Sequence, residues 1–128
     1  MVERIVLGLS ALVWLPYGIY CFFQPSYLEG AAGVGASSAT GTVEIQAMYG
    51  GLQAAIGALC AVALFRESLV RPALVMLAFL ATGLFLARGA AVASGALVDG
   101  YTAFALGFEV VTAGAALWLL RGAGPSPA

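Results

Sequence analysis

The chain has 128 residues, of which 62% are hydrophobic and only 9% are charged, and its formal net charge is −1. Soluble domains carry about 25% charged residues, so this composition excludes a soluble globular enzyme, and its high hydrophobicity excludes an intrinsically disordered chain. The weak negative charge also argues against a nucleic-acid partner, because binding to nucleic acid requires a clustered basic surface.

Four apolar stretches follow one another along the chain. A membrane-spanning helix needs roughly 20 apolar residues, and we assign spans to residues 5–23, 45–65, 73–93 and 102–120. They predict an all-α fold, a four-helix transmembrane bundle with antiparallel up-down topology, in which residues 1–128 form a single integral membrane domain. Residues 122–128 are predicted to be a flexible tail. The first stretch has an alternative interpretation as a cleaved signal peptide, although its apolar run is longer than such peptides need.

The connection between the first two spans, residues 24–44, is rich in Gly, Ala, Ser and Thr. This composition predicts a flexible loop. Thr40 or Thr42 is expected to cap the second helix, which places Glu44 in its first turn, where the helix dipole favours a negative charge.

Small residues recur four positions apart in the second and third spans, and such pairs let membrane helices approach closely. The pairs are Gly50 with Ala54, Gly51 with Ala55, and Gly83 with Ala87. Residues 51–66 also resemble residues 107–121, with Gln53 matching Glu109. This similarity indicates either two related helical hairpins or a shared composition alone.

The basic residues outside the spans predict the orientation in the membrane. Four arginines lie on one side of a four-span topology, while the opposite connections carry acidic residues and no Lys or Arg. Because cytoplasmic loops are enriched in Lys and Arg, both termini are predicted to be cytoplasmic. The chain is therefore expected to be a multi-pass protein of the bacterial inner membrane, with the lipid bilayer as its first partner. The four arginines are Arg4, Arg66, Arg71 and Arg121.

Two ionisable residues lie inside predicted spans, Arg88 in the third and Glu109 in the fourth. Such groups are costly in lipid, so they usually face the bundle interior, are paired and mark function. At a rise of ~1.5 Å per residue, both lie roughly 8–10 Å below the outer ends of adjacent antiparallel helices. The sequence therefore predicts an ion pair in the outer half of the membrane.

Further polar side chains are predicted at the same level. Gln46, Tyr49 and Gln53 share one face of the second helix, and Thr112 shares the face of Glu109. Together they predict an outward-opening pocket with apolar walls. The candidate ligand-binding residues are Tyr17, Glu44, Gln46, Tyr49, Gln53, Arg88, Glu109 and Thr112, and the candidate catalytic residues are Glu44, Arg88 and Glu109. In the alternative interpretation, Arg88 and Glu109 form a structural clamp in which Gln53 and Tyr49 satisfy the remaining guanidinium donors.

The chain contains no His and two widely separated cysteines, Cys21 and Cys60. No familiar ligand set for zinc, haem or an iron–sulfur cluster is present, so we expect neither a metal site nor a cofactor. The two thiols are predicted to lie at different depths, roughly 20 Å apart, and to remain free.

The segment TGTVEIQAMYGGL, residues 40–52, contains a glutamate, two further residues and then A-x-Y-G-G. Together with GLFLARG at 83–89, the Asp-Gly at 99–100 and the Phe-Glu at 108–109, it resembles the bacterial family called domain of unknown function 4345. That family is grouped with the small four-helix DoxX/DoxD-like membrane proteins. The resemblance implies the four-helix fold and no particular activity.

Three functions are compatible with these observations. The first is binding of a lipid-like or isoprenoid-type molecule in the outward-facing pocket. The second is a membrane-embedded enzyme that uses acid–base chemistry for isomerisation or epoxide opening on a hydrophobic substrate. The third is an accessory subunit of a larger membrane complex; a homo-oligomer is also compatible with the sequence.

Overall fold

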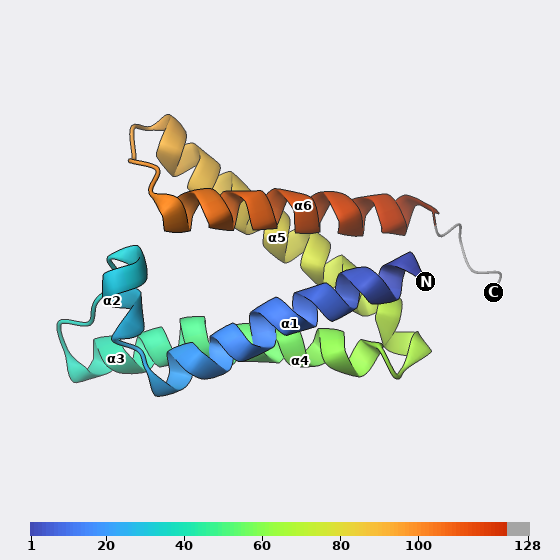
Figure 1. The fold of residues 1–128 in the computed structure, drawn as a ribbon, viewed down its shortest axis with the longest axis horizontal. Coiled ribbons are helices and arrows are strands. Elements are labelled where there is room, and N and C mark those ends of the chain that lie inside the picture. Colours follow the sequence, from blue (N-terminus) through green and yellow to red (C-terminus); the bar gives the residue numbers. More distant parts are fainter. Residues whose placement is uncertain (123–128) are drawn as a thin grey trace.

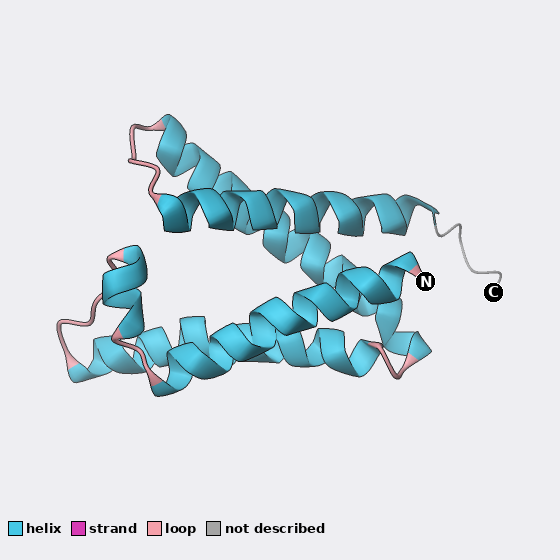
Figure 2. Ribbon diagram, viewed as in Figure 1, coloured by secondary structure: helices cyan, strands magenta, loops and turns pink. Residues whose placement is uncertain are grey.

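The computed structural model describes residues 1–122, and these residues form helices and short connections without any strand (Figure 2). The elements are α1 (Val2–Phe23), α2 (Tyr27–Ala32), α3 (Ala39–Ile45), the π-helix η1 (Gln46–Gly51), α4 (Leu52–Ala63), the 3-10 helix η2 (Glu67–Leu69), α5 (Val70–Ala93) and α6 (Gly100–Gly122). Four helical segments are long and apolar enough to cross a membrane: Val2–Phe23, Ala39–Ala63, Glu67–Ala93 and Gly100–Gly122. The predicted all-α fold with four spans is confirmed. Of the predicted tail, Gly122 belongs to α6 and residues 123–128 lie outside the described part.

The four long segments are arranged as two antiparallel hairpins (Figure 1). In one hairpin, α1 packs along η1 and α4; in the other, α5 packs along α6. The hairpins meet at the end of the molecule that holds the N-terminus and η2, and they diverge toward the end that holds α2. The contact between the hairpins is therefore concentrated at one end.

Glycine allows the close contact within the first hairpin. A Cβ atom at Gly18 would overlap the backbone of Ala54, and one at Gly57 would overlap the backbone of Leu15. Gly50 is similarly close to Phe22, so the helices approach at the Gly50–Ala54 pair, as predicted. The prediction for Gly83 is wrong, because nothing lies within 4 Å of its ideal Cβ position. Gly51 also contacts no other helix; the atom nearest its ideal Cβ is the Gln46 carbonyl oxygen of the same helical segment, at 3.9 Å.

Buried side chains form two separate clusters. The larger one, at the end where the hairpins meet, contains residues of all four long helices, including Leu7, Trp14, Ile56, Leu77 and Ala116. The smaller one consists of Cys21, Leu28 and Ile45, with Tyr17, Val34 and Tyr49 packed against it. Because α5 and α6 contribute nothing to the smaller cluster, the hairpins are not joined by a common core at that end.

The connection 24–44 is largely helical, and the prediction of a flexible loop is wrong there. Leu28 of α2 is completely buried against Cys21 and Ile45, so this apolar side chain holds the connection against the first hairpin. Ser38 caps α3, because its Oγ accepts a hydrogen bond from the Gly41 N–H at 3.1 Å. The helix thus begins before Thr40, and Glu44 lies near the end of α3 rather than in a first turn.

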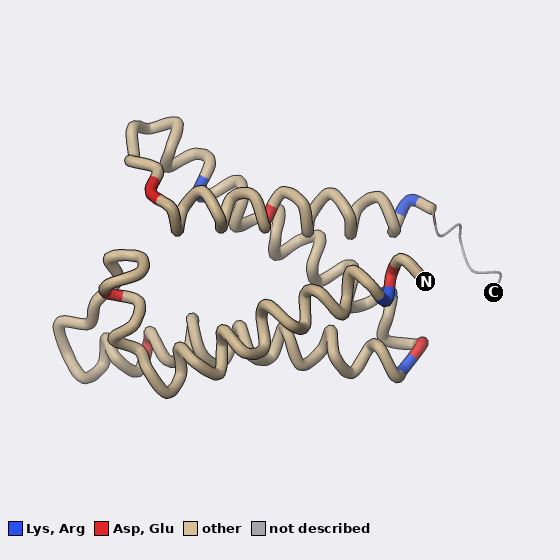
Figure 3. The backbone as a smooth tube through the Cα atoms, viewed as in Figure 1, with Lys and Arg blue, Asp and Glu red and all other residues tan. Residues whose placement is uncertain are grey.

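Charges are distributed unequally between the two ends of the molecule (Figure 3). Arg4 at the start of α1 forms an ion pair of 2.8 Å with Glu67 of η2, and Arg121 lies in the last turn of α6 at the same end. Arg88 lies toward the opposite end, in the last third of α5. The arrangement places the exposed arginines together, as a four-span topology requires.

Candidate functional site

Arg88 and Glu109 form the predicted ion pair. Arg88 Nε donates a hydrogen bond to Glu109 Oε1 at 2.7 Å, joining α5 to α6. The Glu109 side chain is 4% exposed, whereas that of Arg88 is 30% exposed. Glu109 thus lies in the interior, and the guanidinium extends from it toward more accessible space.

The pair makes a single hydrogen bond, although an arginine and a carboxylate can share two. Glu109 Oε2 is buried and has no hydrogen-bond partner among the described residues. Within residues 1–122, the two terminal nitrogens of Arg88 make no hydrogen bond either. Trp14 Nε1 on α1 is a second buried polar atom without a hydrogen-bond partner among residues 1–122. Buried polar groups are normally paired, so these groups mark an unusual region.

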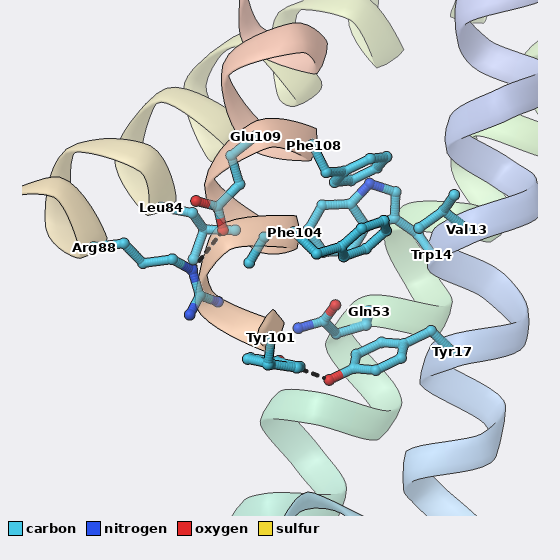
Figure 4. A pocket seen from close by; sticks show the side chains of 11 residues that line it. Val13, Trp14, Tyr17, Gln53, Leu84, Arg88, Tyr101, Phe104, Phe108 and Glu109 are labelled. Atoms are coloured by element: carbon cyan, nitrogen blue, oxygen red, sulfur yellow. Dashed lines mark hydrogen bonds and ion pairs between the residues drawn. The ribbon is translucent and has the colours of Figure 1, made fainter. Parts of the chain in front are cut away.

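These side chains line a cavity of about 90 Å³ between the two hairpins (Figure 4). All four long segments contribute to its wall, and aromatic or aliphatic side chains make up most of it. The apolar residues are Val13, Trp14, Leu84, Phe104, Ala105 and Phe108, and the polar residues are Tyr17, Gln53, Arg88, Tyr101 and Glu109.

Aromatic contacts between α1 and α6 define the position of the pocket. Trp14 packs on Phe108 with ring centroids 5.8 Å apart, and Phe108 also contacts the larger core cluster. Toward the α2 end, the hydroxyl groups of Tyr17 and Tyr101 share a hydrogen bond of 3.0 Å. The pocket occupies the space where the hairpins separate, between these two contacts (Figure 4).

Tyr101 also connects this hydrogen bond to the ion pair. The guanidinium carbon of Arg88 lies 5.8 Å from the centroid of the Tyr101 ring, a distance suited to a cation–π interaction. A continuous set of polar contacts therefore runs from Glu109 through Arg88 and Tyr101 to Tyr17. It crosses from the second hairpin to the first at the polar end of the pocket (Figure 4).

The start of α6 is fixed by Asp99, which precedes it. The Thr102 N–H donates a hydrogen bond of 2.7 Å to Asp99 Oδ1, an N-cap that satisfies one free donor of the first turn. This hydrogen bond lowers the pKa of the Asp99 carboxyl group, which is fully exposed. Because the pKa is lowered, this hydrogen bond stabilises the folded protein at a pH above the ordinary carboxyl pKa. The stabilisation is lost as the pH falls through the lowered pKa of Asp99. Asp99 thus helps to position Tyr101.

The structure brings together four of the eight candidate ligand-binding residues. Tyr17, Gln53, Arg88 and Glu109 line the pocket, although they lie on four different predicted helices. In the described structure, neither Gln53 nor Tyr49 donates or accepts a hydrogen bond with the guanidinium, so the clamp as predicted lacks its two supporting side chains.

The other four candidates lie elsewhere. Gln46 Nε2 donates to the carbonyl oxygen of Phe22 at 2.9 Å, where the last turn of α1 leaves carbonyl groups without helical partners. Tyr49 packs against the smaller core cluster. Glu44 is exposed on α3, and Thr112 is buried in α6 without lining the pocket.

The π-helix η1 explains why Gln46 does not share a face with Gln53. The predicted face assumed an uninterrupted α-helix with 3.6 residues per turn. The i→i+5 bonds of a π-helix give a wider turn, so the residues after Gly51 are rotated relative to those before it. The π-helix coincides with the A-x-Y-G-G segment that carries the family resemblance.

Several pocket residues were not among the sequence-based candidates. Tyr101, Phe104 and Phe108 form one face of α6, and Trp14 with Val13 supplies the opposing wall from α1. The sequence contains only weak indications of these pocket residues. Trp14 carries a polar N–H within an apolar span, and Tyr101 directly follows the helix-capping Asp-Gly. The aromatic side chains otherwise match ordinary lipid-facing residues of a membrane helix.

Residues 2–120 match the family model described as a domain of unknown function, DUF4345. The chain belongs to this family. No curated protein and no solved structure matches it. Because the description of this DUF4345 family assigns no activity, a function for this member must be argued from its own pocket.

Proposed function

We propose that this membrane protein binds an amphipathic molecule, lipid-like or isoprenoid-type, in the pocket between its two hairpins. The observation that carries the proposal is a mostly apolar pocket in which Arg88, Glu109, Tyr101 and Gln53 converge. Small-molecule sites typically combine apolar walls with a few convergent polar groups. The apolar wall suits a hydrocarbon chain, and the polar groups suit one polar end.

The position of the pocket supports entry of such a molecule directly from the bilayer. Phe104 is 68% exposed and Val13 is 37% exposed, and both lie at the edge of the pocket within membrane-spanning helices. Lipid would surround these side chains in a membrane. A hydrophobic ligand could therefore move sideways between α1 and α6 without crossing water.

The charge distribution supports a location for the pocket in the outer half of a bacterial inner membrane. The four arginines other than Arg88 gather at the end where the hairpins meet, which the preference for cytoplasmic Lys and Arg places inside the cell. Of the pocket residues, Tyr17, Arg88 and Tyr101 lie on the parts of their helices nearer the opposite end. Ligand would then be exchanged with the outer leaflet.

A pair of matched variants tests the proposal. Ala105→Phe introduces a large side chain into the pocket wall, while Ala103→Phe makes the same change on an exposed position of α6 outside the wall. We expect the parent protein and Ala103→Phe, purified gently, to retain the same hydrophobic molecule in native mass spectrometry. Ala105→Phe is expected to lose it, because the pocket of about 90 Å³ cannot accommodate both.

Solvent extraction followed by identification of the retained molecule completes this experiment. Equal amounts of the same lipids in all three proteins would contradict binding in the pocket. The ion pair would then be better explained as a structural connection between α5 and α6.

A further inference from the structure

At the polar end of the pocket, hydrogen-bond donors of Arg88 lie beside a buried acceptor of Glu109. The terminal nitrogens of Arg88 are donors without partners among residues 1–122, and this side chain is exposed enough to be reached. The carboxylate of Glu109 has one oxygen without a partner, and it is an acceptor only. A well-matched ligand therefore has to accept a hydrogen bond and also donate one.

The charges around the pocket favour an uncharged ligand. Glu109 already compensates the guanidinium of Arg88. The other charged side chains at this end are acidic: Glu29 of α2, Glu44 of α3 and Asp99 before α6 (Figure 3). A carboxylate or phosphate group would experience their repulsion. An ammonium group would face the guanidinium donors of Arg88, from which it can accept no hydrogen bond.

The size of the pocket favours a small polar group. Its volume is about 90 Å³. An apolar cavity of about 150 Å³ is sufficient to bind benzene, so this pocket is smaller than a benzene site. The enclosed space therefore favours a polar group smaller than a phosphocholine group or a sugar. A single hydroxyl group with the first carbons of its chain would fit.

We propose, on the basis of the function proposed above, that the ligand is an uncharged amphiphile whose polar end is a hydroxyl group, that is, a long-chain or isoprenoid-type alcohol. The hydroxyl oxygen accepts a hydrogen bond from Arg88, and its hydrogen is donated to Glu109. A hydroxyl group supplies one donor and two acceptor lone pairs, whereas ethers, ketones and carboxylates only accept. Those groups would leave the Glu109 carboxylate unsatisfied.

Tryptophan fluorescence can test this preference, because the chain has two tryptophans at different places. Trp14 lines the pocket, and Trp118 is 65% exposed near the opposite end of α6. In Trp118→Phe, Trp14 is the only tryptophan and reports on the pocket. In Trp14→Phe, Trp118 reports on the surrounding lipid. Both proteins are placed in phosphatidylcholine nanodiscs and titrated with a brominated long-chain alcohol, its methyl ether and the matching fatty acid.

We expect the alcohol to quench Trp14 at a concentration roughly tenfold lower than the ether or the ionised acid, since each of these leaves a buried acceptor unpaired. Trp118 should be quenched equally by all three. Stronger quenching of Trp14 by the acid would overturn the proposal in favour of an anionic ligand at Arg88. Equal quenching of Trp14 by the three probes, abolished in the Ala105→Phe background, would refute the hydroxyl preference and leave the binding pocket intact. Quenching of Trp14 no stronger than that of Trp118 would refute the pocket itself.

Discussion

At the scale of single residues, the Arg88–Glu109 pair combines two different roles. Removing two charges from water is costly, and their attraction offsets this cost only when their hydrogen bonds are satisfied. Here one hydrogen bond of 2.7 Å is formed, and the second carboxylate oxygen remains unpaired in the described structure. The pair joins α5 to α6 and still leaves hydrogen-bonding groups available to the pocket.

Replacing Arg88 alone is therefore expected to be more damaging than replacing the pair. Arg88→Leu leaves Glu109 as an uncompensated buried charge, which costs about 3–5 kcal/mol of unfolding free energy in a fully buried pair and less here because Arg88 is partly exposed. The double variant Arg88→Leu/Glu109→Leu should recover much of this loss. Unfolding midpoints measured in detergent provide the comparison.

Arg66→Leu serves as the control, since Arg66 is exposed in the connection between α4 and η2. Its midpoint should stay near that of the parent protein. A double variant that is no more stable than Arg88→Leu alone would show that the damage comes from lost packing rather than from an unpaired charge.

At the scale of helices, the two hairpins are packed differently. Gly18, Gly50 and Gly57 bring α1 into backbone contact with η1 and α4. In α5 and α6, by contrast, no atom lies within 4 Å of the ideal Cβ position at Gly83, Gly107 or Gly114. Close packing of small residues is a main source of helix association in lipid. The first hairpin is thus fixed by backbone contact, and the second depends more on side chains and on the ion pair.

This difference predicts opposite effects for the same substitution. Gly57→Ala places a methyl group against the backbone of Leu15, so we expect a loss of about 1–3 kcal/mol in unfolding free energy. Gly114→Ala meets no neighbour and should be neutral or stabilising by up to about 1 kcal/mol, because alanine favours the helix. Unfolding of both variants in one detergent measures the difference. Similar losses in the two would contradict the close approach of α1 and α4.

At the scale of the whole molecule, the hairpins are joined at one end and separate at the other. The larger core cluster includes side chains of all four long helices, whereas the smaller cluster lacks α5 and α6. Across the separated end, the Tyr17–Tyr101 hydrogen bond of 3.0 Å connects the hairpins. This arrangement creates the pocket and leaves its edge at Phe104 and Val13 open to lipid.

The orientation of the molecule can be tested by labelling single cysteines. Ser37 precedes α3 at the α2 end, and Ser68 lies in η2 at the opposite end; both are exposed. After replacement of Cys21 and Cys60, which are buried and free, Ser37→Cys should react with an impermeant thiol reagent added to intact cells. Ser68→Cys should react only after the membrane is disrupted. The reverse pattern would place the arginine-rich end outside.

The ion pair and part of the pocket could be predicted from the sequence because they follow from distances along helices. Arg88 and Glu109 lie at similar depths in adjacent antiparallel spans, and a fixed rise per residue makes their meeting predictable. The position of Gln46 relative to Gln53 was not predictable in this way. It depends on the π-helix at Gln46–Gly51, which no simple periodicity in the sequence reveals.

Composition and apolar length determined that the chain is an all-α protein with four membrane-spanning helices, because backbone groups in lipid must be satisfied within each helix. The tertiary structure decided which faces meet. Both Gly50 and Gly83 begin small-residue pairs, yet only Gly50 lies at a helix contact. Aromatic residues such as Phe104 and Tyr101 became pocket residues only through the rotation of α6 against α1. That rotation is set by packing among all the helices together, and lipid-facing and partner-facing apolar residues have the same composition.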